Sequence, residues 1–167
     1  MISWPRESVL QACRQYAPLL PDMGDVDGAR LLAAIAMKES SLGADCDPRH
    51  EPSWDIGGEY ASNPQQAKNL QLYPYAAACS YTPLQIMFYN CPGCTPDELN
   101  TDLALGIRVS VYYMSRQINR WKIDSVRGVS EMWNWGHPER PFEVVPLEVL
   151  DYCNDVAGYY LAAEAWT

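Results

Sequence analysis

Long apolar runs are missing from this chain of 167 residues. No uninterrupted stretch approaches the roughly 20 residues that a membrane-spanning helix needs, so we expect no membrane span. The first residues, from Met1 to Glu7, also lack the succession of basic, apolar and small residues that marks a secretory signal. Internal repeats, low-complexity tracts and strand-like alternation are equally scarce, which argues against a repeat protein and against an all-β domain.

Basic residues are scarce as well, with 12 Lys and Arg against 21 Asp and Glu, which gives a formal net charge of −9. Proteins that bind nucleic acid through phosphate contacts need a positive surface, so we expect no nucleic-acid partner. The same charge repels other anionic polymers at long range. A ligand of that kind must therefore be recognised by a local groove rather than by the field of the whole molecule.

Histidine occurs only twice, at His50 and His137, far from the single C-x-x-C motif at residues 91–94. This composition argues against a zinc site, and we expect no metal and no cofactor. An even number of cysteines favours disulfides in an oxidising compartment, with free buried thiols as the alternative. We therefore expect a periplasmic or extracellular protein, exported by a signal trimmed from this chain, as part of a larger polypeptide, or released by a phage-type lysis system. The six cysteines are Cys13, Cys46, Cys79, Cys91, Cys94 and Cys153.

Periodic apolar residues predict a mainly α fold, a single domain of about six to eight helices over residues 1–167. The longest pattern runs from Leu103 to Trp121, where apolar residues recur every three or four positions. Asp27 is the predicted cap of an apolar helix that ends near Ser41. Other helices are expected to begin near Pro5, Pro64, Thr82, Thr95, Asp124 or Ser125, and Pro146.

Residues from about 44 to 79 form a long loop-rich insertion that contains several prolines and glycines. Only the stretch from Pro64 to about Leu72 has a helical pattern, with Ser62 or Asn63 as its cap. Loops of this length inside compact domains are usually functional or disordered. We therefore expect the insertion either to contribute to a site or to lack a fixed structure.

One acidic residue, Glu39, ends an otherwise apolar predicted helix. It follows Leu31 and Ile35 at four-residue spacing, so its carboxyl group belongs to the buried stripe of that helix. Burial and the negative end of the helix dipole both disfavour ionisation, so we expect a raised pKa for Glu39. A carboxyl group that keeps its proton near neutral pH suits general acid catalysis. The alternative is a partly exposed, solvated carboxylate without a catalytic role.

Four short motifs follow one another along the predicted helices: Glu39-Ser40, Leu84-Gln85-Ile86-Met87, Trp133-Asn134-Trp135-Gly136, and Tyr152 with Val156. Their joint order, over about residues 28 to 160, resembles the lytic transglycosylase and goose-type lysozyme group. That group has a lysozyme-like helical fold and cleaves the β-1,4 bond between N-acetylmuramic acid and N-acetylglucosamine in peptidoglycan. The resemblance implies a monomeric enzyme that acts on peptidoglycan glycan strands.

The resemblance also implies a role for each motif. Glu39 would be the general acid and base, and Ser40 would support hydrogen bonding in the active site. Gln85 would line the sugar groove, Asn134 would face the cleaved sugar, and Tyr152 would reach toward the catalytic Glu. Capping or ordinary packing is the alternative for the last three side chains. Aromatic residues available for stacking on sugars are Tyr60, Tyr73, Tyr75, Tyr81, Trp133 and Trp135.

The chain departs from the group in two places. Thr82-Pro83 stands where the group has a Gly near its Gln, so the groove is expected to have a different shape there. The connection from Glu39 to Gln85, 85 − 39 = 46 positions, is longer than usual, so the insertion is specific to this chain. In goose-type lysozymes an Asp closely follows the Gln motif, and none does here. This favours lytic transglycosylation, in which the N-acetyl group of the substrate assists and one Glu acts as acid and then as base.

Three alternatives stay open. A hydrolytic muramidase would need a second carboxylate, and Asp55, beside the shielding indole of Trp54, is the candidate for positioning water. A non-catalytic wall-binding or virion structural module would fit the acidic charge and the altered Gln motif. A glycosidase acting on chitin or a related N-acetylated glycan would also fit a helical lysozyme-like fold. The acids that the insertion offers are Asp45, Asp47, Glu51, Asp55 and Glu59.

Overall fold

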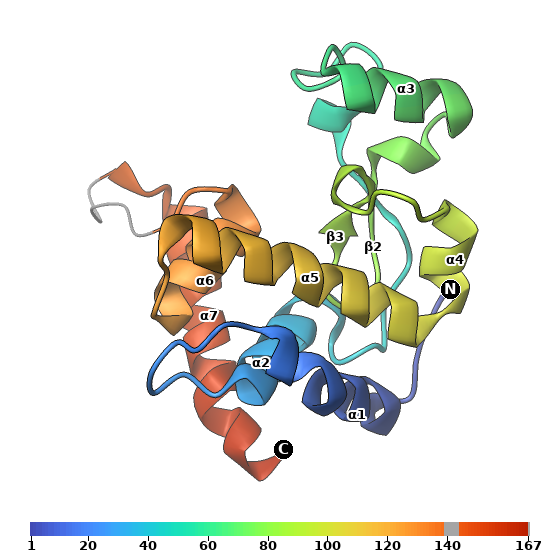
Figure 1. Ribbon diagram of the computed structural model, residues 1–167. Helices are drawn as coiled ribbons and strands as arrows, with labels where there is room; N and C mark the ends of the chain where they lie inside the picture. The colour runs from blue at the N-terminus through green and yellow to red at the C-terminus, as the bar shows by residue number, and fades with distance from the viewer. Residues whose placement is uncertain (139–143, 167) are drawn as a thin grey trace.

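The computed structural model describes residues 1–138 and 144–166. Over these ranges the chain forms seven α-helices with short 3₁₀ turns and three short strands, so the mainly α fold is confirmed (Figure 1). None of the helices in the described ranges combines the length and the apolar character needed to cross a bilayer. The helices are α1 (Arg6–Tyr16), α2 (Gly28–Ser40), α3 (Pro64–Leu72), α4 (Pro96–Thr101), α5 (Leu103–Trp121), α6 (Val126–Trp135) and α7 (Leu147–Ala162).

Side-chain caps begin most of these helices where the sequence predicts them. Asp27 accepts hydrogen bonds from two backbone N–H groups in the first turn of α2. Asn63 caps α3 and Ser125 caps α6 in the same way. Thr95 and Glu98 form a reciprocal capping box at α4. These local hydrogen bonds replace the partners that the first N–H groups of a helix lack, which is why they can be predicted from short sequence patterns.

The main core surrounds α2, which packs against α1 and α7, and α6 in turn packs against α7. Six consecutive residues of α2, from Leu31 to Ala36, are completely buried. A helix segment that is apolar on all faces is buried by neighbouring elements on every side. The C-terminal end of α2, which carries Glu39, therefore has a fixed position in the fold.

The insertion is a folded lobe with a core of its own. Figure 1 shows α3 at the far end of the molecule from α1 and α2. Buried residues of the insertion pack there against residues that follow it in the sequence. This second core consists of Leu70, Ala77, Ala78, Cys79, Tyr81, Ile86, Phe88, Cys91 and Leu99. The insertion is therefore ordered, and it forms one side of the molecule beside the helical core.

A small antiparallel sheet joins the insertion to the rest of the chain. Its strands, in spatial order, are β1 (Arg49–His50), β2 (Cys79–Tyr81) and β3 (Ile86–Met87). The predicted short helix from Thr82 to Met87 is wrong, because a tight turn closed by the Gln85 N–H and the Thr82 carbonyl at 3.0 Å joins β2 to β3. Thr82 and Gln85 both have positive φ, 74° and 52°, which no helix accommodates. Strands of two or three residues are too short for an alternating pattern to reveal them.

The six cysteines are all free thiols in the structure, and five of them are buried. This arrangement counts against the expected disulfides, which stay a prediction. Burial raises the pKa of the Cys13 thiol to about 12 and that of Cys46 to about 11. Thiols of this kind behave as small apolar core residues and stay protonated at neutral pH.

Candidate active site

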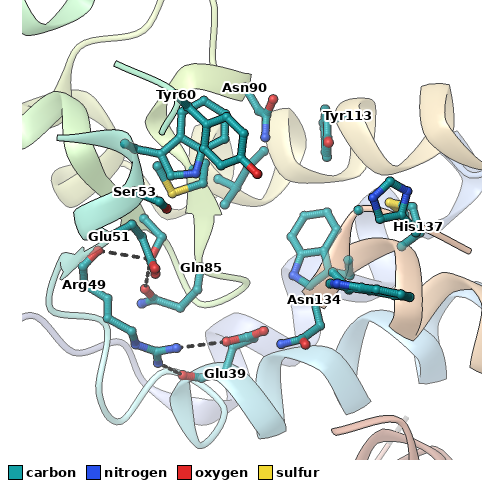
Figure 2. A pocket seen from close by; sticks show the side chains of 18 residues that line it. Glu39, Arg49, Glu51, Ser53, Tyr60, Gln85, Asn90, Tyr113, Asn134 and His137 are labelled. Carbon is teal, nitrogen blue, oxygen red and sulfur yellow. Dashed lines mark hydrogen bonds and ion pairs between the residues drawn. The ribbon is translucent and has the colours of Figure 1, made fainter. Parts of the chain in front are cut away.

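One cavity of about 520 Å³ lies between the end of α2, the small sheet and the end of α6. Its volume falls in the range of common small-ligand sites. Figure 2 shows the side chains that surround it, with those of the insertion and sheet facing those of α6. The sheet side contributes Arg49, Glu51, Ser53, Trp54, Tyr60, Ser80, Gln85, Ile86, Met87 and Asn90. The other residues that line it are Glu39, Tyr113, Met132, Trp133, Asn134, Trp135, Gly136 and His137.

The carboxyl group of Glu39 lies at one end of this cavity, with only 10% of its side chain exposed. Tyr152 Oη donates a hydrogen bond to Glu39 Oε1 at 2.7 Å, and Arg49 Nη1 donates one to Oε2 at 3.2 Å. Burial raises the pKa of Glu39, while Tyr152 and the charge of Arg49 oppose the increase without cancelling it. The pKa of Glu39 is thus raised in the structure, as the sequence predicts.

Arg49 is a site residue that the sequence did not reveal. Its Nη2 also donates to the backbone carbonyl of Glu39 at 2.7 Å, so the guanidinium bridges the side chain and the main chain of one residue. Strand β1 places it there, because Arg49 pairs with Ser80 of β2 beside the cavity. An Arg in a proline-rich insertion carries no sequence signal for such a role. The contact exists only because the short sheet brings the insertion to the end of α2.

Tyr152 and Ser40 lie behind the cavity and are not among the described residues that line it. Tyr152 is 6% exposed on α7, and burial together with the nearby Glu39 raises its pKa well above the ordinary value, so it stays a protonated donor. Ser40 Oγ donates toward the carbonyl oxygens of Ala36 at 3.0 Å and Pro83 at 2.9 Å. Ser40 therefore links the end of α2 to the turn that carries Gln85, and does not contact the cavity itself.

Gln85 and Asn134 line the cavity on opposite sides of Glu39. Gln85 Oε1 accepts a hydrogen bond from Ser80 Oγ at 2.8 Å, which fixes the side chain on the sheet side. Asn134 is exposed in the last turn of α6. Figure 2 shows Glu39 between Arg49 and Asn134, with the Asn134 amide directed toward Glu39. The structure therefore brings together Glu39, Gln85 and Asn134, which lie far apart in the sequence.

Asp55 is not brought to this group. It is absent from the described lining of the cavity, and its Oδ2 lies 2.8 Å from His50 Nε2. That hydrogen bond, with one from the Ile56 N–H, lowers the pKa of Asp55. The acid of the insertion that does line the cavity is Glu51, whose pKa is raised by burial, against the opposing charge of Arg49. Glu51 was one of five candidate acids in the sequence, and spacing alone could not select it.

Aromatic side chains form much of the wall. Trp54 and Tyr60 of the insertion lie against each other with ring centroids 4.7 Å apart. On the opposite side, Trp133 Nε1 donates to the Leu84 carbonyl at 3.0 Å, which ties α6 to the β2–β3 turn. Of the aromatics proposed for stacking, Tyr60, Trp133 and Trp135 line the cavity, while Tyr73, Tyr75 and Tyr81 do not. The arrangement offers flat apolar faces beside polar groups, as carbohydrate recognition requires.

Thr82, in the turn before Gln85, has a positive φ of the kind that glycine usually adopts. A φ of 74° is rare for a β-branched residue, and such strain is typical of functional sites. The Thr82 side chain fits because Gly106 of α5 faces it, and a Cβ at that glycine would lie 2.8 Å from Thr82 Cγ2. Thr82, which the sequence has in place of the glycine of the enzymes that it resembles, therefore fits into this turn because α5 leaves room for its side chain.

Within the described ranges, no group of three or more His, Cys, Asp or Glu side chains is placed to hold a metal ion. The described side chains of the cavity offer one buried carboxyl with two hydrogen-bond donors, a second carboxyl, three amides and several aromatic rings. The chain matches no family model, no curated protein and no solved structure, so the geometry of the site alone must carry a functional conclusion.

Proposed function

We propose that this protein is a peptidoglycan lytic transglycosylase that cleaves the β-1,4 bond between N-acetylmuramic acid and N-acetylglucosamine, with Glu39 as general acid and base. The observation that carries this proposal is the carboxyl group of Glu39, 10% exposed, at the end of an aromatic-lined cavity. Burial holds a proton there at higher pH than in an ordinary Glu. Peptidoglycan lies outside the cytoplasm, so the enzyme would act in the periplasm or outside the cell.

Two proton transfers complete the reaction. Glu39 gives its proton to the glycosidic oxygen as the bond to the anomeric carbon breaks, and the N-acetyl oxygen of the same sugar stabilises that carbon. The ionised Glu39 then takes a proton from a hydroxyl of this sugar, whose oxygen attacks the anomeric carbon and forms an anhydro end. The Tyr152 hydroxyl stabilises the carboxylate between the two steps. Glu39 finishes protonated, and no water is consumed.

The walls of the cavity support a sugar substrate. Trp54 and Tyr60 on one side and Trp133 and Trp135 on the other provide ring faces for pyranose rings. Gln85 and Asn134 add amide groups to the lining of the same cavity. Because the net charge of −9 repels anionic polymers, this local groove has to provide the affinity.

A hydrolytic muramidase is the second candidate, and Glu51 favours it. Hydrolysis usually requires a second carboxylate beside the scissile bond, either as a base for water or as a nucleophile. Glu51 lines the same cavity as Glu39, and the charge of Arg49 helps to keep it ionised. Asp55, held by His50 outside the described lining of the cavity, is less suited to this role.

Product analysis separates the candidates. Purified peptidoglycan and chitin are incubated with the wild type and with Glu39→Gln, and the soluble products are examined by mass spectrometry. Anhydro ends support transglycosylation, reducing ends support hydrolysis, and cleavage of chitin alone supports a chitin-directed glycosidase. Glu39→Gln should lose cleavage, whereas Glu59→Gln, an exposed acid of the insertion, should keep it. No soluble product from either glycan contradicts the proposal and favours a binding module.

A further inference from the structure

Arg49 is the only Lys or Arg among the described residues that line the cavity. Its guanidinium donates to Glu39 Oε2 at 3.2 Å and to the Glu39 carbonyl at 2.7 Å. A guanidinium has five N–H donors in a planar fork, so these two bonds leave others for a further partner. The Arg49 side chain is 53% exposed while that of Glu39 is 10% exposed. Arg49 therefore reaches from the open part of the cavity to the buried acid (Figure 2).

This ion pair opposes the task proposed for Glu39, because a general acid must be protonated before it can react. Three groups around Glu39 favour its ionised form: Arg49 from β1, the Tyr152 hydroxyl from α7 and the charge of Lys38 from α2 itself. Burial favours the protonated form. Two of these groups contact the carboxyl oxygens, and Arg49 is more exposed than Tyr152. A ligand that enters the cavity therefore reaches Arg49 first.

We propose that Arg49 binds a carboxylate carried by the substrate sugar, and that this contact releases Glu39 from its ion pair so that Glu39 takes up the proton it will donate. Guanidinium and carboxylate groups form two parallel hydrogen bonds of high specificity. This inference rests on the proposed function. Within it, Arg49 selects glycans that bear a free carboxylate, such as the lactyl group of N-acetylmuramic acid in strands that carry no peptide. On a neutral glycan such as chitin, Arg49 stays paired with Glu39.

Charge in the rest of the cavity fits this exchange. Glu51 lines the same cavity and interacts with Arg49, so the guanidinium keeps a negative neighbour while it moves between partners. When the sugar carboxylate arrives and Glu39 takes up a proton, the number of negative charges around Arg49 is unchanged. Carboxylate binding and protonation of Glu39 are therefore linked, and each must strengthen the other.

The first test measures this linkage without altering Arg49. The wild type and Glu39→Gln are titrated with N-acetylmuramic acid and with N-acetylglucosamine by NMR, from about pH 5 to about pH 8, above the ordinary carboxyl pKa. We expect the wild type to bind N-acetylmuramic acid more tightly as the pH falls. Glu39→Gln, which resembles the protonated acid, should bind it with an affinity that changes little with pH. Equal pH dependence for both proteins or for both sugars would overturn the inference.

The second test measures specificity. Peptide-free peptidoglycan strands are used with their lactyl carboxylates free or converted to methylamides. We expect the wild type to favour the free form in kcat/KM by about 10- to 100-fold, the worth of hydrogen bonds to a charged group. The preference should disappear in Arg49→Gln and survive in part in Arg49→Lys. Thermal melting shows whether each variant folds. If Arg49→Gln does not fold, the test is made with Arg49→Lys, whose preference for the free carboxylate should be smaller than that of the wild type.

The outcomes distinguish this inference from the function on which it rests. If the wild type cuts both forms equally, or prefers the methylamide, Arg49 does not select carboxylates and the inference fails while the proposed function stands. If the wild type cuts neither form, the proposed function fails and the inference fails with it. A wild-type preference for the carboxylate that Arg49→Gln retains would also overturn it.

Discussion

The hydroxyl of Tyr152 offers a direct test of how the pKa of Glu39 is set. Tyr152→Phe removes one oxygen atom from a buried position and leaves the ring packing in place. The hydroxyl donates to Glu39 Oε1 at 2.7 Å, and this bond stabilises the ionised form of the acid. Hydrogen bonds to charged groups are worth about 1.5–3 kcal/mol. Because the ionised form loses this stabilisation, we expect the pKa of Glu39 to rise further in the variant.

The sign of the effect on stability follows from the same shift. The pKa of Glu39 in the folded protein already lies above its ordinary value, so the protein is most stable with respect to this group below the unfolded pKa. That contribution is lost as the pH rises through the folded pKa. Tyr152→Phe should extend this loss to higher pH, so the variant should be destabilised more at neutral than at acidic pH.

Two measurements check these expectations. The decline of kcat/KM at high pH, which reports ionisation of the general acid, should move to higher pH in Tyr152→Phe. Direct titration of the Glu39 carboxyl by NMR should show the same shift without substrate. Tyr159→Phe, two turns further along α7, is the matched control and should change neither. An unchanged titration of Glu39 in a folded Tyr152→Phe protein would refute the reasoning.

Three further substitutions test the surroundings of the site. Gly106→Ala places a Cβ 2.8 Å from Thr82 Cγ2, so it should lower the free energy of unfolding by about 1–3 kcal/mol, measured by denaturant titration. Ser40→Ala removes the buried donor to the Pro83 carbonyl and should lower the free energy of unfolding by about 1–3 kcal/mol in the same assay. Ser53→Ala, at an exposed position of the insertion, is the control and should leave that free energy unchanged. Glu51→Gln should leave anhydro products intact if the enzyme is a transglycosylase, whereas loss of reducing-end products would reveal a hydrolase.

Local features of the fold could be predicted from the sequence because they depend on neighbouring residues. Asp27 and the Thr95–Glu98 capping box lie within a few positions of the N–H groups that they satisfy. The long apolar period from Leu103 to Trp121 appears as α5 with the bounds expected. The turn at Thr82 could not be predicted, because its positive φ depends on the space that Gly106 leaves 24 positions later (106 − 82 = 24).

The candidate site likewise has features that the sequence predicts and features that depend on the tertiary structure. The sequence by itself determined that Glu39 would end a buried helix with a raised pKa, since four-residue spacing and an apolar composition suffice for that conclusion. Only the tertiary structure decided which groups face this carboxyl. Tyr152 is 113 positions away, and Arg49 reaches it through a two-residue strand without a sequence signature. The tertiary structure also decided that Glu51 and not Asp55 lines the cavity, because the distance between side chains on a folded insertion depends on packing and not on their order in the chain.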